Sequence, residues 1–277
     1  MVYEKIIDNV YAITDGSTRG NVCAFELPSQ IIFVDSGMHI PIIKKFRTEL
    51  EKETGKKTST LLITHVHGDH LFGNQVFKDC KIVAHKSTRE RMIKSLETDW
   101  SPDVIEEWKK NLEDPASLEG LEITLSTDTF ENKMEIEDYD VKLIYKNTGG
   151  HTAGSSYVYY PDAKALAGGD NLFIDRFPWA GDQSADPQTW INTLKEYLSL
   201  DVEYFIPGHG PVCGKEKVQE LLDYLEKAVI LMRKMIAEGH KEKTIIEKVN
   251  EIDYHPPKRE EWKTNSLKKW YQILSSK

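Results

Sequence analysis

The chain has 277 residues and a formal net charge of -9, with 39% hydrophobic and 29% charged residues. This composition is typical of a globular protein and excludes a disordered, collagen-like or disulfide-stapled chain. The length allows one large domain or two small ones. The acidic balance disfavours a general nucleic-acid binder, which usually has a basic face, so we expect no nucleic-acid partner.

The sequence contains few signals that indicate a cellular location or a redox compartment. The longest apolar run, Ala228 to Met232, is far shorter than the roughly 20 residues of a membrane span. The first residues, MVYEKIIDNVYAI, do not have the pattern of a signal peptide. Cys23, Cys80 and Cys213 form no CxxC pair. We therefore expect a reduced, cytoplasmic protein without a membrane partner.

The first third of the chain alternates predicted strands with predicted helices. Strands are expected at 10–14, 21–27, 31–37, 60–65 and 81–85, where β-branched and aromatic runs are broken by Gly, Asn and Pro. Residues 40–52 have helical spacing, and 71–77 one or two helical turns. Residues 86–118 are charged and helical in pattern, which predicts a helical insertion.

The remainder of the chain predicts more strands and then helices. Strands are expected within 122–130 and 134–149, a hairpin over 155–170, a helix that begins at Pro187, and a strand at 203–210. From residue 215 onward the pattern is helical and highly charged. We predict one α/β domain at 1–214, with the insertion at 86–118 and a helical C-terminal extension at 215–277 packed on it.

The segment THVHGDH is the most informative part of the sequence. It places His65, His67, Asp69 and His70 directly after a predicted buried strand. Alternating His65 and His67 point the same way in extended backbone, whereas Asp69 and His70 project differently where a helix begins. Without a metal, burying these groups would cost several kcal/mol of unpaired polar desolvation. One loop is therefore expected to serve two adjacent metal ions.

Three further candidate ligands each follow a predicted strand and are flanked by glycine. They are His151 in GGHTAGS, Asp170 in LAGGDNLF and His209 in IPGHGP. Glycine lets the backbone turn sharply and brings a short side chain close to an ion. We expect these residues to complete the metal site.

As an ordered set, THVHGDH, GGHTAGS, GGDN and PGHG resemble the motifs of the metallo-β-lactamase fold superfamily. The resemblance covers roughly Val10 to Gly214 and leaves the C-terminal tail outside. It implies a four-layer αββα sandwich of two mixed β-sheets, with the metals at one edge of the sheets.

The resemblance also implies a role for each candidate residue. His65, His67 and His151 would hold the first ion, Asp69, His70 and His209 the second, and Asp170 would bridge them. Asp35, in VDSG, matches the family's acidic residue behind the loop and would orient the ligands by hydrogen bonds.

The types of ligand predict the chemistry. Imidazole and carboxylate suit two Zn²⁺ ions, with Fe or Mn as alternatives. Two such ions share a water, lower its pKa, and polarise the carbonyl or phosphoryl group that the resulting hydroxide attacks. Asp69 is expected to orient this nucleophile, so no serine or cysteine nucleophile is needed.

Single residues distinguish the branches of the superfamily. β-Lactamases usually have another residue at the bridging position, where this chain has Asp170, and flavodiiron enzymes resemble HxExDH, where it has His67. The run from residue 150 to 173 is similar to thioesterases of the glyoxalase II type. We therefore expect hydrolysis of a small thioester or lactone. Alternatives are a single-iron persulfide dioxygenase-like oxidoreductase, β-lactamase-like or phosphodiesterase activity, and a nucleic-acid-processing protein.

Candidate substrate contacts are Phe177 and Trp179, in an apolar loop after Asp170, and Asn74, four residues after His70. The C-terminal extension also contains aromatic residues. Two roles of these aromatic residues stay open. One is contact with a second subunit in a homodimer, and the other is to cover the protein's own cleft.

Overall fold

A computed structural model of the chain describes residues 1–112 and 114–276. Its first sheet has the strand order β1-β2-β3-β4-β5-β6-β7. The strands are β1 Glu4–Ile7, β2 Val10–Ile13, β3 Val22–Glu26, β4 Gln30–Val34, β5 Lys57–Ile63, β6 Lys81–His85 and β7 Asp128–Phe130. β1 to β4 are antiparallel neighbours, whereas β4 to β7 run parallel. β5 lies inside this sheet, between β4 and β6. Its carboxyl end lies where the parallel strands β4 to β7 all end.

The second sheet has the order β12-β11-β10-β9-β8. Its strands are β8 Lys133–Asp138, β9 Val141–Asn147, β10 Ser156–Tyr160, β11 Ala165–Phe173 and β12 Tyr204–His209. β8 to β11 are antiparallel, and β11 and β12 are parallel. The expected hairpin at 155–170 is confirmed as β10 and β11.

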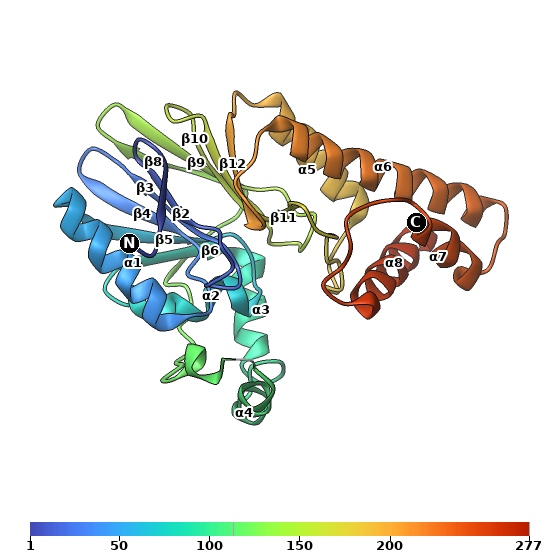
Figure 1. Cartoon of the computed structure of the whole chain (residues 1–277), viewed down its shortest axis with the longest axis horizontal. Helices are drawn as coiled ribbons and strands as arrows, with labels where there is room; N and C mark the ends of the chain where they lie inside the picture. The colour runs from blue at the N-terminus through green and yellow to red at the C-terminus, as the bar shows by residue number, and fades with distance from the viewer. Residues whose placement is uncertain (113, 277) are drawn as a thin grey trace.

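The two sheets face each other, with helices on both outer faces (Figure 1). Between the sheets lies an apolar core that includes Phe25 and Val34 from the first sheet and Tyr145 and Val158 from the second. The hydroxyl of Tyr145 donates a hydrogen bond of 2.6 Å to the carbonyl of Ile63, at the end of β5. The four-layer αββα sandwich is thereby confirmed.

Helix α1 (Ile40–Thr54) covers the outer face of the first sheet through a separate core that contains Phe33, Phe46 and Phe77. The short helix α2 (Gly68–Leu71) and a 3-10 helix at Phe72–Phe77 follow β5. Proline in the first turn of α1 fits a position that has no intrahelical hydrogen-bond partner.

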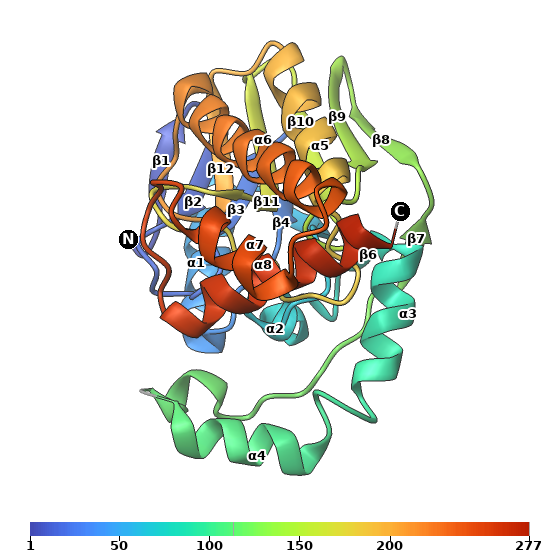
Figure 2. The ribbon, with the colours of Figure 1, turned by 90° about the vertical axis from the view of Figure 1, so that its right-hand side faces the viewer.

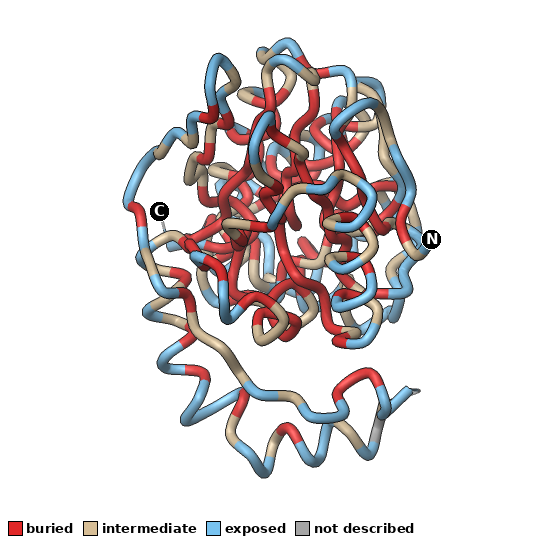
Figure 3. The backbone as a smooth tube through the Cα atoms, turned by 90° about the vertical axis from the view of Figure 1, so that its left-hand side faces the viewer, coloured by how far each residue is buried: buried red, intermediate tan, exposed pale blue. Residues whose placement is uncertain are grey.

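The segment 86–118 forms an arm that extends from the body of the molecule (Figure 2). It contains α3 (Lys86–Ser95), α4 (Pro102–Asn111) and a 3-10 helix at Pro115–Leu118. Figure 3 shows that most of this arm is exposed or half-buried, in contrast to the body. Its aromatic anchor is Phe72, whose ring centroid lies 5.6 Å from that of Trp100 and 6.2 Å from that of Trp108.

The outer face of the second sheet is covered by α5 (Pro187–Ser199) and α6 (Lys215–Ala237). Beyond them, α7 (Glu242–Asn250) and α8 (Glu260–Ser275) pack into the same core through Ile245, Leu267 and Trp270. The C-terminal extension is therefore continuous with the core of the second half.

One strand prediction differs from the structure. Of the segment 122–130, only Asp128–Phe130 joins the sheet, as β7, while residues 122–127 stay outside any ladder. An alternating pattern shows which residues face inward, but not whether a neighbouring strand is within hydrogen-bonding reach. No helix within the described residues is long and apolar enough to cross a membrane.

Replacing Trp270 with alanine tests the contribution of the C-terminal core. Trp270 is fully buried against Phe177, Trp190 and Tyr224. Truncation of a buried tryptophan leaves a cavity, so we expect the free energy of unfolding in urea to fall by about 3–5 kcal/mol. Ile230→Ala, at an exposed position of α6, is the matched control and should change it by less than about 0.5 kcal/mol. If Trp270→Ala lowers the free energy of unfolding no more than Ile230→Ala does, the packing described is contradicted.

Candidate metal centre

The histidine-rich loop begins where β5 ends. His65 lies two residues after Ile63, and His67 is the N-cap residue of α2 in extended backbone. Asp69 and His70 lie in the first turn of α2. The change from extended to helical backbone lets one short segment direct its side chains to two neighbouring places.

The second sheet supplies the other three predicted ligands. His151 lies in the loop between β9 and β10, Asp170 lies in β11, and His209 ends β12. Parallel pairing of β11 with β12 brings Asp170 and His209 to the same edge. A Cβ on Gly208 would lie 2.0 Å from Oδ1 of Asp170, so only glycine lets the two strands approach so closely here.

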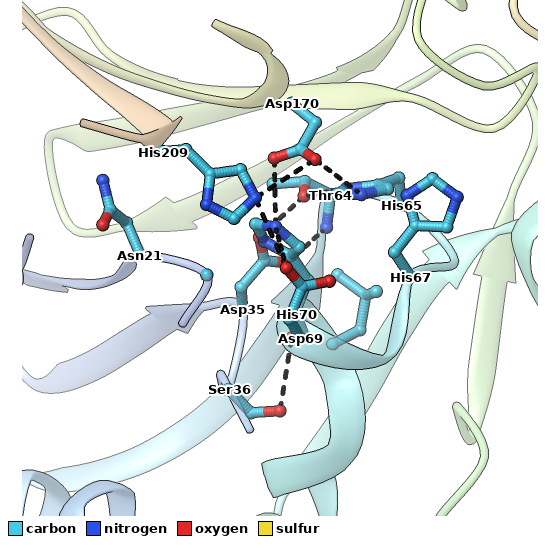
Figure 4. A network of polar contacts seen from close by, with 12 residues as sticks. Asn21, Asp35, Ser36, Thr64, His65, His67, Asp69, His70, Asp170 and His209 are labelled. Atoms are coloured by element: carbon cyan, nitrogen blue, oxygen red, sulfur yellow. Dashed lines mark hydrogen bonds and ion pairs between the residues drawn. The ribbon is translucent and has the colours of Figure 1, made fainter. Parts of the chain in front are cut away.

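These side chains converge on two adjacent ligand groups, and Figure 4 shows all of them except His151 labelled. The first group is His65, His67, His151 and Asp170, and the second is Asp69, His70 and His209; within each, the ligand atoms lie within 4.8 Å of one another. Asp170 also reaches the second group. Its Oδ1 is 3.0 Å from Nε2 of His70, and its Oδ2 is 3.4 Å from Nε2 of both His151 and His209. Asp170 is therefore placed to bridge two ions.

The residues fit a pair of divalent cations. Nε2 of His65, Nε2 of His70 and Oδ1 of Asp170 are buried, and none makes a well-aligned hydrogen bond among the described residues, although the last two atoms lie 3.0 Å apart. Buried polar atoms without partners are costly in a stable protein, and these three point into the ligand groups. Imidazole and carboxylate ligands are the set that Zn²⁺ accepts.

Asp35 holds two of the imidazoles from behind. It adopts a left-handed backbone conformation, with φ of 59°, directly after β4. One carboxylate oxygen, Oδ2, accepts hydrogen bonds from Oγ1 of Thr64 at 2.7 Å and from Nδ1 of His70 at 2.9 Å. Because the Thr64 hydroxyl donates to Asp35, it accepts from Nδ1 of His65, 3.0 Å away. Both imidazoles are thus left with Nε2 free to bind metal.

Charge differs between the two ligand groups. Burial lowers the pKa of His151 to about 3 and holds that of His65 well below its usual range, so these imidazoles are neutral. Burial also opposes protonation of His209, but the carboxylates of Asp170 and Asp69 outweigh it and raise its pKa to about 9. Without metal, the second group is therefore an ion-pair cluster.

Several residues of the site were not identified from the sequence. Asn21 joins the two halves, since its side-chain nitrogen donates to the carbonyls of Pro207 and Gly210, both at 2.8 Å. A Cβ on Gly20 would lie 2.8 Å from Nε2 of His70, so the backbone passes close to this ligand. Asp182 approaches His67, with 3.2 Å between Oδ2 and Nε2. The only sequence signal for Gly20 and Asn21 was that they form a Gly-Asn pair directly before β3.

Two predicted substrate contacts, Phe177 and Asn74, lie inside the protein and stay predictions. Phe177 is buried in the C-terminal core, where its ring meets those of Tyr224 and Trp270. Asn74 is fully buried, accepts a hydrogen bond from Ser36 and donates one to the carbonyl of Thr124. The ring of Phe177 packs against other rings, and the polar groups of Asn74 form hydrogen bonds, within the protein.

Trp179 remains a candidate for substrate contact. It is half-buried, and its ring lies edge-on to His67, at 5.1 Å between centroids, and 5.8 Å from His151. It therefore forms an apolar border to the first ligand group.

Metal analysis tests the two ligand groups. After loading with Zn²⁺ and removal of free metal, we expect about two ions per chain, as for a two-metal site. His67→Ala removes one ligand of the first group and should reduce this to about one ion while the far-ultraviolet circular dichroism stays unchanged. Fewer than about one ion per native chain by elemental analysis would contradict the assignment.

Zinc binding is expected to release protons. His209 is protonated below its raised pKa of about 9, and must lose that proton before it binds a cation. Affinity for Zn²⁺ at the second group should therefore rise with pH up to about 9. Calorimetric titration of the metal-free protein in buffers with different heats of ionisation measures the released protons. Asp69→Asn removes one of the two carboxylates and should reduce the release; a heat independent of buffer would refute this charge state.

Comparison with known proteins identifies the family. The sequence profile of the metallo-β-lactamase superfamily matches residues 20–209. A linear primary-alkylsulfatase from a Pseudomonas strain is 23% identical over 232 residues, which cover 74% of this chain and 44% of the relative. A type 2 metallo-β-lactamase from Bacillus cereus is 25% identical over 201 residues, with 71% and 69% of the two chains covered. The chain thus spans less than half the length of the alkylsulfatase.

Solved structures show the same fold. A metallo-β-lactamase from Pontibacter korlensis superposes with a TM-score of 0.62 at 18% identity, over 81% of this chain and 98% of that one. A sec-alkylsulfatase from Pseudomonas sp. superposes with a TM-score of 0.71 at 14% identity, over 98% of this chain and 49% of that one. Profile and fold agree, and the chain belongs to the metallo-β-lactamase superfamily.

Proposed function

We propose that the protein is a two-metal hydrolase that cleaves a small ester-like substrate, a thioester or a lactone. The observation that carries the proposal is the position of Asp170 between the two ligand groups, with one oxygen 3.0 Å from His70 and the other 3.4 Å from His151 and His209. A carboxylate in this place suits two ions rather than one. This favours the hydrolase over the single-iron oxidoreductase.

When bound, two divalent cations activate a shared water molecule and polarise the substrate oxygen. The protein's own groups position the reaction. Asp69 is partly exposed, with its Oδ2 3.3 Å from Nε2 of His209, and is placed to accept a hydrogen bond from the attacking water. The buried imidazoles, with Asp35 behind them, keep the donor atoms fixed. Such preorganisation lowers the cost of reorganisation during the reaction.

The surroundings support a small substrate with an apolar part. Trp179 borders the first ligand group, and an apolar wall beside a polar centre is typical of binding sites for small molecules. An aspartate at position 170, where β-lactamases usually have another residue, favours an ester-like bond over a β-lactam. The donor set favours zinc, with iron or manganese as alternatives.

A sulfate ester is the second candidate substrate. Its support is the alkylsulfatase likeness, which in the superposition extends over 98% of this chain and so includes the C-terminal helices. The β-lactamase superposition covers 81% of the chain. A sulfate monoester would use the same water-activating centre.

A substrate panel tests the proposal. Zinc-loaded and iron-loaded protein is offered thioesters, lactones, alkyl sulfates, phosphodiesters and β-lactams. We expect turnover of thioesters or lactones, and a fall of at least about 100-fold in kcat/KM for His67→Ala, whose site cannot hold both ions. Asn192→Ala, on the exposed side of α5, is the control and should retain full activity.

Each other outcome of the panel has a clear meaning. Turnover of alkyl sulfates alone would select the second candidate and refute the first. Oxygen consumption with a persulfide, without any hydrolysis, would refute both. Activity that survives His67→Ala unchanged would show that the reaction occurs elsewhere on the protein.

A further inference from the structure

The loop between β11 and α5, residues 174–186, contains a buried carboxylate outside the ligand groups. Asp182 has 4% of its surface exposed. Its Oδ2 lies 3.2 Å from Nε2 of His67, and no motif of the sequence assigns it a role. A buried carboxylate beside a histidine that belongs to a metal-ligand group has the form of an orienting contact.

The orientation of the His67 ring shows what this contact does. Its Nδ1 faces the first ligand group and lies 3.0 Å from Nε2 of His151, whereas its Nε2 faces Asp182. A neutral imidazole carries one proton, and a carboxylate can only accept it. Asp182 therefore favours the form with the proton on Nε2 and leaves the lone pair of Nδ1 directed at the metal position.

We propose that Asp182 is a positioning residue of the metal centre, which fixes the tautomer and the orientation of His67. Asp35 already provides this support for His70, and for His65 through Thr64. Asp35 gives no such support to His67. The ring of His67 turns Nδ1, rather than Nε2, toward its ligand group. Each histidine of the HxHxDH segment then has an outer carboxylate that determines which nitrogen is free.

The carboxylate of Asp182 is itself held in place. Its Oδ1 accepts hydrogen bonds from the backbone N–H of Ser184 at 2.8 Å and from the Ser184 hydroxyl at 2.6 Å. The guanidinium of Arg91, on α3, lies 3.7 Å from Oδ2. One oxygen is thus engaged by the turn, and the other is left for His67 and Arg91.

The C-terminal helices anchor the loop that carries Asp182. The backbone N–H of Ala180 donates to the hydroxyl of buried Ser266 on α8 at 2.8 Å. The N–H of Phe177 donates to the carbonyl of Pro256 at 3.2 Å. The helical extension therefore supports His67 indirectly, through this loop and Asp182.

The test reads zinc binding rather than turnover, since the inference depends on the metal centre and not on the substrate. Metal-free protein is titrated with Zn²⁺ against a competing chelator, and the step lost in His67→Ala identifies the first ligand group. Asp182→Ala should raise the dissociation constant of that step by about 10–100-fold. Asp182→Asn keeps an acceptor oxygen and should recover part of the affinity.

Ser184→Ala is the matched control. It removes the hydroxyl contact to Oδ1 but leaves the contact of Oδ2 with His67, so zinc affinity should stay within about 3-fold of the native value, a fraction of the effect expected for an orienting carboxylate. If Ser184→Ala weakens zinc binding as much as Asp182→Ala does, the carboxylate acts only through the turn and the inference is overturned.

The histidine tautomer gives an independent readout. Long-range proton–nitrogen correlation spectra of the zinc-loaded native protein should show His67 with its proton on Nε2 and metal on Nδ1. The same spectra of Asp182→Asn should show a shifted or broadened His67 signal. A native spectrum with metal on Nε2 of His67 would overturn the inference even where Asp182→Ala does not fold.

Discussion

One buried carboxylate, that of Asp170, lies between imidazoles from both ligand groups, and the rest of the site is arranged around it. The carboxylates of Asp170 and Asp69 raise the pKa of His209 to about 9, so without metal a proton on this imidazole balances their charge. The arrangement is possible because β11 and β12 are parallel and end at the same edge, which faces the end of β5. The fold thus brings together the ligand atoms of two candidate metal-binding groups.

A second set of residues keeps these groups in place. Asp35 supports His70 and, through Thr64, His65. Asn21 donates to the carbonyls of Pro207 and Gly210, on either side of His209 at the end of β12, and so joins the first half of the chain to the second. Such outer contacts orient the ligands, and the loss of one typically costs about 10–100-fold in metal affinity or activity.

The residues themselves were sufficient to predict the hairpin and the convergence of the HxHxDH segment with His151, Asp170 and His209, because those ligands share a spacing and strand-end position that few other roles demand. The four layers were predicted only through the resemblance to the metallo-β-lactamase fold superfamily. The sequence did not show that Asn74 and Phe177 are buried. Both lie near the motifs along the chain, yet burial turns their side chains into the protein. Asp182 was not predicted, because it lies far along the chain from His67, the histidine that it contacts.

The division of the ligands between two sheets has a consequence for folding. The histidine loop after β5 and the ends of β11 and β12 belong to halves of the chain that meet only in the native structure. Cations held by both halves act as a non-covalent cross-link that closes a very long loop. Since the unfolded chain lacks this preformed site, any cation that both halves bind would shift the equilibrium toward the folded state, and chelation would lower the free energy of unfolding.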